Sequence, residues 1–248
     1  NHHWKFSVNA LREGLGVSRF LLLNDFTALA LSLTLLPDAQ KRQVGGGVAA
    51  PDAAIGLIGP GTGLGVSGLF PVGYQNKWMP IAGEGGHVSL TATTEHEFAA
   101  IQQLQKRYGH VSAERVISGA GLVDLYHALC DLKDGQGREI TTPAEVIERA
   151  QEVATSTANE ALDMFCGFLG SVAGDLALTL GARGGIYIGG GIVPRLGERF
   201  DTSPFRERFE AKGRFKKYLQ EVPTWVIHSP VSPALQGASQ ALSLTQWQ

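Results

Sequence analysis

The sequence has little of what secreted, metal-binding or membrane proteins depend on. Only two cysteines occur among 248 residues, Cys130 and Cys166, and they lie far apart. They build neither a disulfide framework nor a zinc spacing, so a cytoplasmic location is expected. No uninterrupted apolar run approaches the roughly 18 to 20 residues of a membrane span. The first residues show no signal-peptide pattern, and we expect no membrane partner.

An excess of charge of one sign is also absent. The chain carries 21 Lys and Arg against 23 Asp and Glu, a formal net charge of -2, so no nucleic-acid partner is expected. Its most basic stretch, residues 195–217, interleaves Lys and Arg with acidic residues and reads as a solvated face. Glycine is plentiful, with 32 residues, which implies many tight turns.

Strand-like and helix-like patterns alternate along the chain and predict an α/β protein with mixed sheets. Pro37 ends an apolar helix, and the polar residues 38–44 then lead to three glycines, a candidate hinge or domain boundary. Ser112 is a candidate cap of a short helix that carries Glu114. The expected strands are 20–23, 54–59, 65–70, one within 184–191 that runs into a glycine turn, and 224–228. The main expected helices are 8–14, 26–35, 94–107, one marked by 122–129, one that starts at 142, 155–180 and 233–244.

Asn24 and Asp25 interrupt an otherwise apolar run between the expected strand 20–23 and the helix that follows. Ligands of open α/β sheets bind at the carboxyl ends of strands, so these two side chains are candidates for a site. Asp25 also stands where a helix N-cap would stand. From this stretch alone, a pure capping role is an open alternative.

Residues 59–65, Gly-Pro-Gly-Thr-Gly-Leu-Gly, form the first candidate turn for an anion. Successive N–H groups in a glycine turn can form an anion-binding nest, and Thr62 adds a hydroxyl. No Lys-Ser/Thr pair follows, and the turn joins strand to strand, so neither a Walker A loop nor a dinucleotide fingerprint fits. A phosphate clasp within a hairpin and a merely tight turn both remain open.

Glu84 and His87 lie in a glycine-rich loop, and Glu114 follows downstream. Carboxylates and imidazole suit the hydroxyl groups of a sugar, whereas a metal site lacks the usual helical His spacing. Each residue taken singly also fits a surface or loop-bracing role. The glycines of residues 184–191 could approach a nucleotide closely, or could simply end a buried strand.

Five motifs together resemble one family. They are L-N-D-F-T-A-L-A at 23–30, G-P-G-T-G-L-G-V at 59–66, G-E-G-G-H-V at 83–88, H-V-S-A-E-R-V-I-S-G at 110–119 and G-G-I-Y-I-G-G-G-I-V-P-R at 184–195. In this order and spacing they resemble the bacterial ATP-dependent glucokinases of the sugar kinase, Hsp70 and actin superfamily. Residues 1–4 are similar to that family's N-H-x-W segment.

The resemblance implies an actin-like, ribonuclease H-like fold of two domains. Residues 1–36 would be the remainder of an incomplete small domain, 37–227 the large domain, and 228–248 a helix that returns to the small domain. It also implies a cytoplasmic homodimer that converts ATP and D-glucose into ADP and D-glucose 6-phosphate, the first step of glycolysis.

The resemblance also implies a role for each candidate residue. Asp25 corresponds to the catalytic base, and the sugar ligands correspond to Asn24, Glu84, His87 and Glu114. Mg²⁺ and ATP are the implied cofactors, with no metal ligand identified in this sequence. The implied nucleotide-binding residues are Gly61, Thr62 and Gly63 in the second phosphate loop and Gly189, Gly190 and Gly191 in the adenosine segment.

The sequence departs from the family at one place. The family's first phosphate loop, Asp-x-Gly-Gly-Thr, does not appear, so we expect a chain that lacks the N-terminal part. The alternative function is then a truncated, catalytically silent sugar-binding or regulatory protein. A related family of sugar kinases and repressors fits less well, because its cysteine-rich zinc cluster is not found here.

Overall fold

The computed structural model describes residues 5–73, 77–133, 135 and 138–243. Within these ranges, six strands form one sheet in the order β1-β6-β5-β2-β3-β4. β5 pairs in parallel with β2 and β6, and the other neighbours pair antiparallel, so the expected mixed sheet is confirmed. The strands are β1 (Lys41–Val44), β2 (Ile55–Pro60), β3 (Leu64–Val72), β4 (Lys77–Ala82), β5 (Ile186–Ile188) and β6 (Thr224–Ile227).

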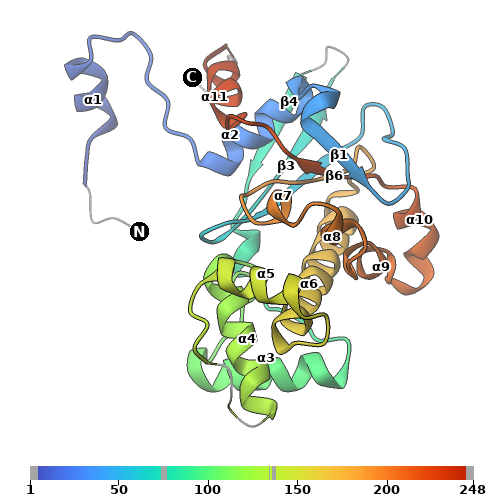
Figure 1. Cartoon of the computed structure of the whole chain (residues 1–248). Coiled ribbons are helices and arrows are strands. Elements are labelled where there is room, and N and C mark those ends of the chain that lie inside the picture. The colour runs from blue at the N-terminus through green and yellow to red at the C-terminus, as the bar shows by residue number, and fades with distance from the viewer. Residues whose placement is uncertain (1–4, 74–76, 134, 136–137, 244–248) are drawn as a thin grey trace.

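Helices cover both faces of this sheet (Figure 1). Short 3-10 turns lie at 33–35, 38–40, 85–87 and 213–215. The α-helices are α1 (Val8–Gly14), α2 (Asp25–Ser32), α3 (Glu95–Tyr108), α4 (Gly119–Lys133), α5 (Pro143–Glu152), α6 (Thr157–Leu180), α7 (Val193–Leu196), α8 (Glu198–Asp201), α9 (Phe205–Glu210), α10 (Lys216–Gln220) and α11 (Ala234–Ser243).

The sheet is buried on both sides because alternate residues of its central strands enter different cores. In β2, Leu57 packs with α2 and α11, whereas Ile58 belongs to the larger core formed with the helical layer. In β6, Ile227 and Val226 divide in the same way. Every residue of β2 is buried, which explains why its sequence is uniformly apolar or glycine.

The long helix α6 is the core of the helical layer. By length and composition it could cross a membrane, but 67% of its most apolar 18-residue window is buried inside the protein. Glycines on α6 allow close packing: a Cβ added to Gly170 would lie 2.1 Å from the carbonyl oxygen of Phe205 in α9. These features are those of a core helix.

Several expected elements appear with nearly the expected bounds. α1 spans the predicted residues 8–14, and β2 and β3 form the predicted antiparallel hairpin. The capping boxes at Thr94 and Thr142 both form, so α3 and α5 begin where the sequence places them. The final helix, expected to reach residue 244, is described to Ser243, because residue 244 lies outside the described ranges.

Other expectations were wrong. Residues 20–23 form no regular secondary structure and join no ladder of the described sheet, and a strand requires a hydrogen-bonded partner. Ser112 and Glu114 lie in a turn that an isolated bridge from Ser89 to Ser112 anchors, so the short helix predicted there does not form. Residues 41–44, read as part of a polar linker, form β1, and β4 was not anticipated.

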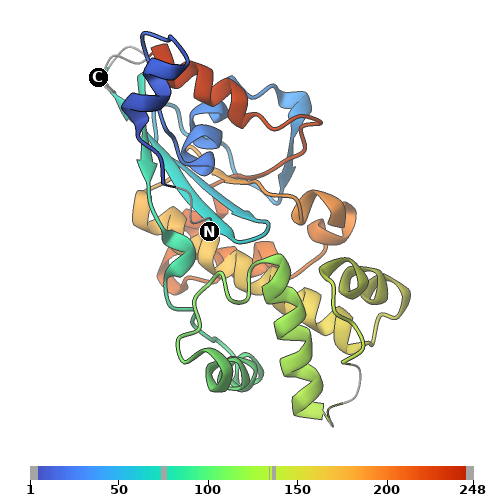
Figure 2. The same ribbon diagram turned by 90° about the vertical axis from the view of Figure 1, so that its left-hand side faces the viewer.

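The segment before α2 stands apart from the sheet in Figure 1. α1 buries none of its residues, and the chain reaches α2 through residues 15–24, which form no helix or strand. The two views (Figures 1 and 2) show α11 beside α2, and these helices pack extensively. The division into 1–36, 37–227 and 228–248 remains a prediction, and the segment 1–4 lies outside the described residues.

Candidate active site

Asn24 and Asp25 lie at the N-terminus of α2, but the predicted capping role belongs to Asn24. The side-chain oxygen of Asn24 accepts hydrogen bonds from the backbone N–H groups of Phe26 at 2.8 Å and Thr27 at 3.2 Å. Asp25 is the first helical residue, and its Oδ1 accepts from Phe26 N–H at 2.9 Å. The helix dipole favours a carboxylate here, so an exposed anion is held with a defined orientation.

The ring of Phe26 joins the start of α2 to the hairpin. It fills the space above Gly59 and Gly65, which face each other across β2 and β3. A Cβ on Gly65 would lie 2.1 Å from this ring, and a Cβ on Gly59 would lie 2.6 Å from it. These two glycines therefore let α2 approach the hairpin and bring Asp25 beside the turn. The packing of Phe26 was not predicted from the sequence, although Gly59 and Gly65, the glycines that leave room for its ring, stand at either end of the turn motif.

The glycine turn, Asp25 and Glu114 line a single pocket of about 360 Å³. Glu114 Oε2 accepts a hydrogen bond from the backbone N–H of Leu64 at 2.9 Å. The carbonyl of Gly61 accepts from Gly119 N–H at 2.9 Å, while Thr62 is exposed at the tip. The turn is therefore braced from the 114–119 segment, with its tip open to a ligand.

Glu84 and His87 lie in the neighbouring loop, with both side chains exposed. His87 N–H donates to the carbonyl of Glu84 at 3.0 Å and closes a short 3-10 turn. This loop is attached to the pocket, because the Gly86 carbonyl accepts from Glu114 N–H at 2.8 Å. Neither Glu84 nor His87 is among the residues that line the 360 Å³ pocket, so the structure does not bring them into it with Asp25 and Glu114.

Gly189, Gly190 and Gly191 line a second pocket of about 390 Å³. Gly190 also lines the first pocket, so the two hollows adjoin. With φ at +78°, Gly190 sits where a Cβ would lie 2.2 Å from the carbonyl oxygen of Pro60, which requires glycine. His228, which follows β6, also lines this pocket.

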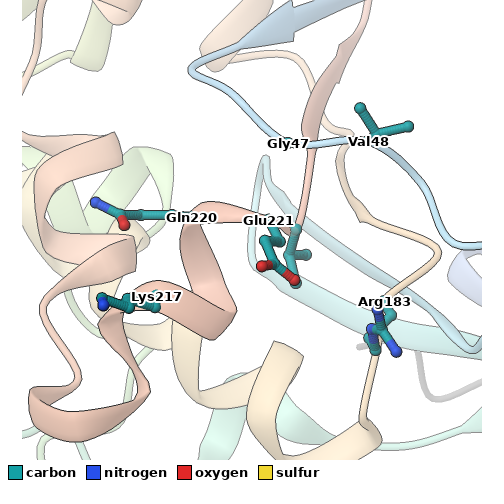
Figure 3. Close-up of a pocket in the computed structure, with 7 residues that line it drawn as sticks. Gly47, Val48, Arg183, Lys217, Gln220 and Glu221 are labelled. Carbon is teal, nitrogen blue, oxygen red and sulfur yellow. The ribbon is translucent and has the colours of Figure 1, made fainter.

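A larger pocket of about 640 Å³ lies elsewhere and contains none of the predicted site residues. Figure 3 shows the mixed charges of its lining, with Arg183 and Lys217 as cations and Glu221 as the anion. Arg183 precedes β5 and Glu221 precedes β6, so this pocket lies toward the amino ends of those strands. The predicted residues 61–63 and 189–191 instead follow the carboxyl ends of β2 and β5, where α/β proteins bind ligands.

Comparisons with known proteins show which family the whole chain is similar to. The family model described as Glucokinase matches residues 1–245. Glucokinase from Chromobacterium violaceum is 54% identical over 98% of this chain and 69% of its own length. Among solved structures, glucokinase from an Antarctic psychrotroph superimposes with a TM-score of 0.87 at 34% identity, covering 96% of this chain and 73% of its own. A ROK family glucokinase from Streptomyces griseus, solved with glucose and AMPPNP, has a TM-score of 0.62 at 18% identity, covering 94% of this chain and 68% of its own, which shows the shared fold.

Proposed function

Because the chain belongs to the glucokinase family, we propose that it transfers the γ-phosphoryl group of ATP to the 6-hydroxyl of D-glucose, giving ADP and D-glucose 6-phosphate. The predicted actin-like ATPase fold is confirmed by the same relatives. The observation that supports the proposed site best is the single pocket lined by Asp25, the glycine turn and Glu114. It juxtaposes the Asp25 carboxylate, a glycine turn whose tip is exposed, and the Glu114 carboxylate as a hydrogen-bond acceptor.

In the proposed mechanism, Asp25 is the general base. Phe26 N–H binds Asp25 Oδ1, and the other oxygen, Oδ2, accepts the proton of the sugar hydroxyl as its oxygen attacks the γ-phosphorus. The bond from phosphorus to the bridging oxygen of ADP breaks at the same time. Phosphoryl transfer depends mainly on positioning and charge stabilisation, which suits a base fixed at a helix start.

The remaining candidate residues hold the two substrates. The side-chain oxygen of Asn24 caps α2, so its side-chain NH₂ group is the part that can donate to a sugar oxygen. We assign Glu84, His87 and Glu114 to sugar hydroxyls. Gly61 N–H already donates to the carbonyl of Gly63 at 2.8 Å within the turn, so the N–H groups of Thr62 and Gly63 are the ones assigned to the phosphates. Gly61 contributes by letting the phosphates approach closely, and residues 189–191 in the adjoining pocket are assigned to adenosine.

We also propose that ATP enters as its magnesium complex. Magnesium typically keeps waters and phosphate oxygens and takes only one or two protein carboxylates. Across the described ranges, no group of three or more His, Cys, Asp or Glu could hold a metal ion. Asp25 and Glu114 are the carboxylates that line the pocket. A cytoplasmic location and a homodimer remain part of the proposal.

A coupled assay of glucose-dependent ADP formation tests this function, with Asp25→Asn as the key variant. A positioned general base contributes about a hundredfold or more, so kcat should fall at least that far while glucose still binds. Turnover of Asp25→Asn within about tenfold of the parent chain would remove Asp25 as the base. Glucose binding by the parent chain without any turnover would favour the sugar-binding alternative instead.

A further inference from the structure

Glu114 connects the two halves of the proposed site. Its Oε2 accepts from Leu64 N–H at 2.9 Å, where the glycine turn enters β3. Its own backbone N–H donates to the carbonyl of Gly86 at 2.8 Å, in the loop that carries Glu84 and His87. One residue thus contacts both the turn assigned to phosphates and the loop assigned to the sugar.

Gly63 shows how tightly this carboxylate fits against the turn. A Cβ built on Gly63 would lie 2.4 Å from Glu114 Oε2 and 3.2 Å from its carboxyl carbon. Gly63 is not among the glycines with positive φ, so its backbone conformation is open to other residues. A side chain at this position would therefore displace the Glu114 carboxylate from the turn, without straining the backbone.

The second carboxylate oxygen is available to a ligand. Glu114 is half-buried and lines the pocket, and among the described residues no donor bonds to its Oε1. A buried or half-buried carboxylate oxygen gains from a donor, and a hexose offers hydroxyl groups of this kind.

We infer that Glu114 couples the sugar and nucleotide subsites. A glucose hydroxyl on Oε1 and Leu64 N–H on Oε2 hold the same carboxylate, so bound sugar fixes the turn in the form that receives the phosphates. This inference rests on the proposed function and adds a linkage to it. Since coupling is reciprocal, glucose and nucleotide should tighten each other's binding by the same factor.

Calorimetry on the full chain tests the linkage. A non-hydrolysable ATP analogue with Mg²⁺ is titrated in the absence and presence of saturating glucose. The parent chain should bind the analogue at least about fivefold more tightly with glucose. In Gly63→Ala, the ratio of the analogue's affinity with glucose to its affinity without glucose should be near one, because the added methyl group displaces the Glu114 carboxylate. Gly83→Ala is the matched control, since a Cβ there meets nothing within 4 Å, and it should keep the parental ratio.

Glu114→Asp is the second variant, because its shorter side chain keeps the charge but cannot span both contacts. It should also lose the coupling. Hydrogen exchange in the parent chain needs no variant: glucose alone should slow exchange of the Leu64 amide severalfold. Three results would each overturn the coupling but leave the kinase proposal standing. They are an affinity ratio near one in the parent chain, a parental affinity ratio in either variant, and unchanged hydrogen exchange of the Leu64 amide on adding glucose. Failure of the parent chain to bind glucose would overturn the proposed function and the coupling with it.

Discussion

Two glutamates in this protein show how the helical layer and the pocket differ. In the helical layer, Glu97 accepts hydrogen bonds from Thr93 N–H at 2.7 Å, Thr93 Oγ1 at 3.0 Å and Thr94 N–H at 3.2 Å, and it pairs with Arg208. Glu114 has a hydrogen bond to one side-chain oxygen among the described residues. A carboxylate whose hydrogen-bonding capacity is filled stabilises a fold, whereas one with spare capacity can bind a ligand.

The environment of Glu97 also sets its ionisation. Burial raises its pKa, but the hydrogen bonds and charge of Arg208, with the donors of Thr93, outweigh burial and hold the pKa below its usual value. Arg208 donates in addition to Ser171 Oγ at 3.0 Å, so it ties α9 to both α3 and α6. The pair therefore belongs to the packing of the helical layer.

The largest expected effect comes from breaking this pair. Arg208→Met leaves Glu97, which is 4% exposed, without its cation, and removing one partner of a buried pair costs about 3 kcal/mol or more. Urea unfolding should show this loss, while kcat of the folded enzyme changes little. Lys212→Met is the matched control, because its partner Asp175 is 63% exposed, and it should cost less than about 1 kcal/mol. Equal losses in the two variants would contradict the contrast.

The helical layer was also the more predictable region. The capping boxes at Thr94 and Thr142 and the apolar period within residues 155–180 are local signals, so the sequence located α3, α5 and α6. The strand expected at 20–23 depended on a partner that no local pattern could supply. β1 escaped notice because its polar residues suit an edge strand as well as a linker.

At the site, residue types were predictable but their contacts were not. The sequence suggested Asp25, Glu114 and the glycine turn, and the structure brings them together. It did not show that Asn24 rather than Asp25 caps α2, or that Phe26 fills the hairpin. Such contacts depend on how distant segments approach each other in three dimensions.

Two alanine variants in β3 compare a glycine beside the pocket with one away from it, and their expected effects are the next largest. Gly65→Ala crowds the Phe26 ring, and overpacking typically costs about 1–3 kcal/mol. Because Phe26 adjoins Asp25, this variant should also lower kcat severalfold. Gly68→Ala crowds Leu180 at 2.8 Å and the carbonyl of Ile55 at 2.9 Å, away from the pocket. It should lose stability and keep kcat, as measured by thermal melts and the coupled assay.

The ionisation of Glu97 has a smaller effect on the free energy of unfolding, and this effect depends on pH. Its pKa is lower in the folded than in the unfolded chain, so the stability it contributes is complete above the unfolded value of about 4.3. That contribution should disappear as the pH falls through the folded pKa, at about 1.4 kcal/mol for each unit of difference. Urea unfolding between pH 7 and 3 should therefore show a steeper acid loss in the parent chain than in Glu97→Gln. Parallel curves would contradict the assignment.

The smallest expected loss of stability is shared by two helix caps, and only one of them should affect catalysis. Asn24 caps α2 at the pocket, and Ser156 caps α6 in the helical layer, where its Oγ accepts from Asn159 N–H at 3.1 Å. Replacing either by alanine should cost about 1 kcal/mol, since each removes one acceptor for the free N–H groups of a helix start. Asn24→Ala should in addition raise the KM for glucose, because it removes the amide group assigned to the sugar, whereas Ser156→Ala should leave KM and kcat at parental values. A similar rise in KM for both variants would mean that the effect follows from lost helix stability, and Asn24 would then be a cap without a role in sugar binding.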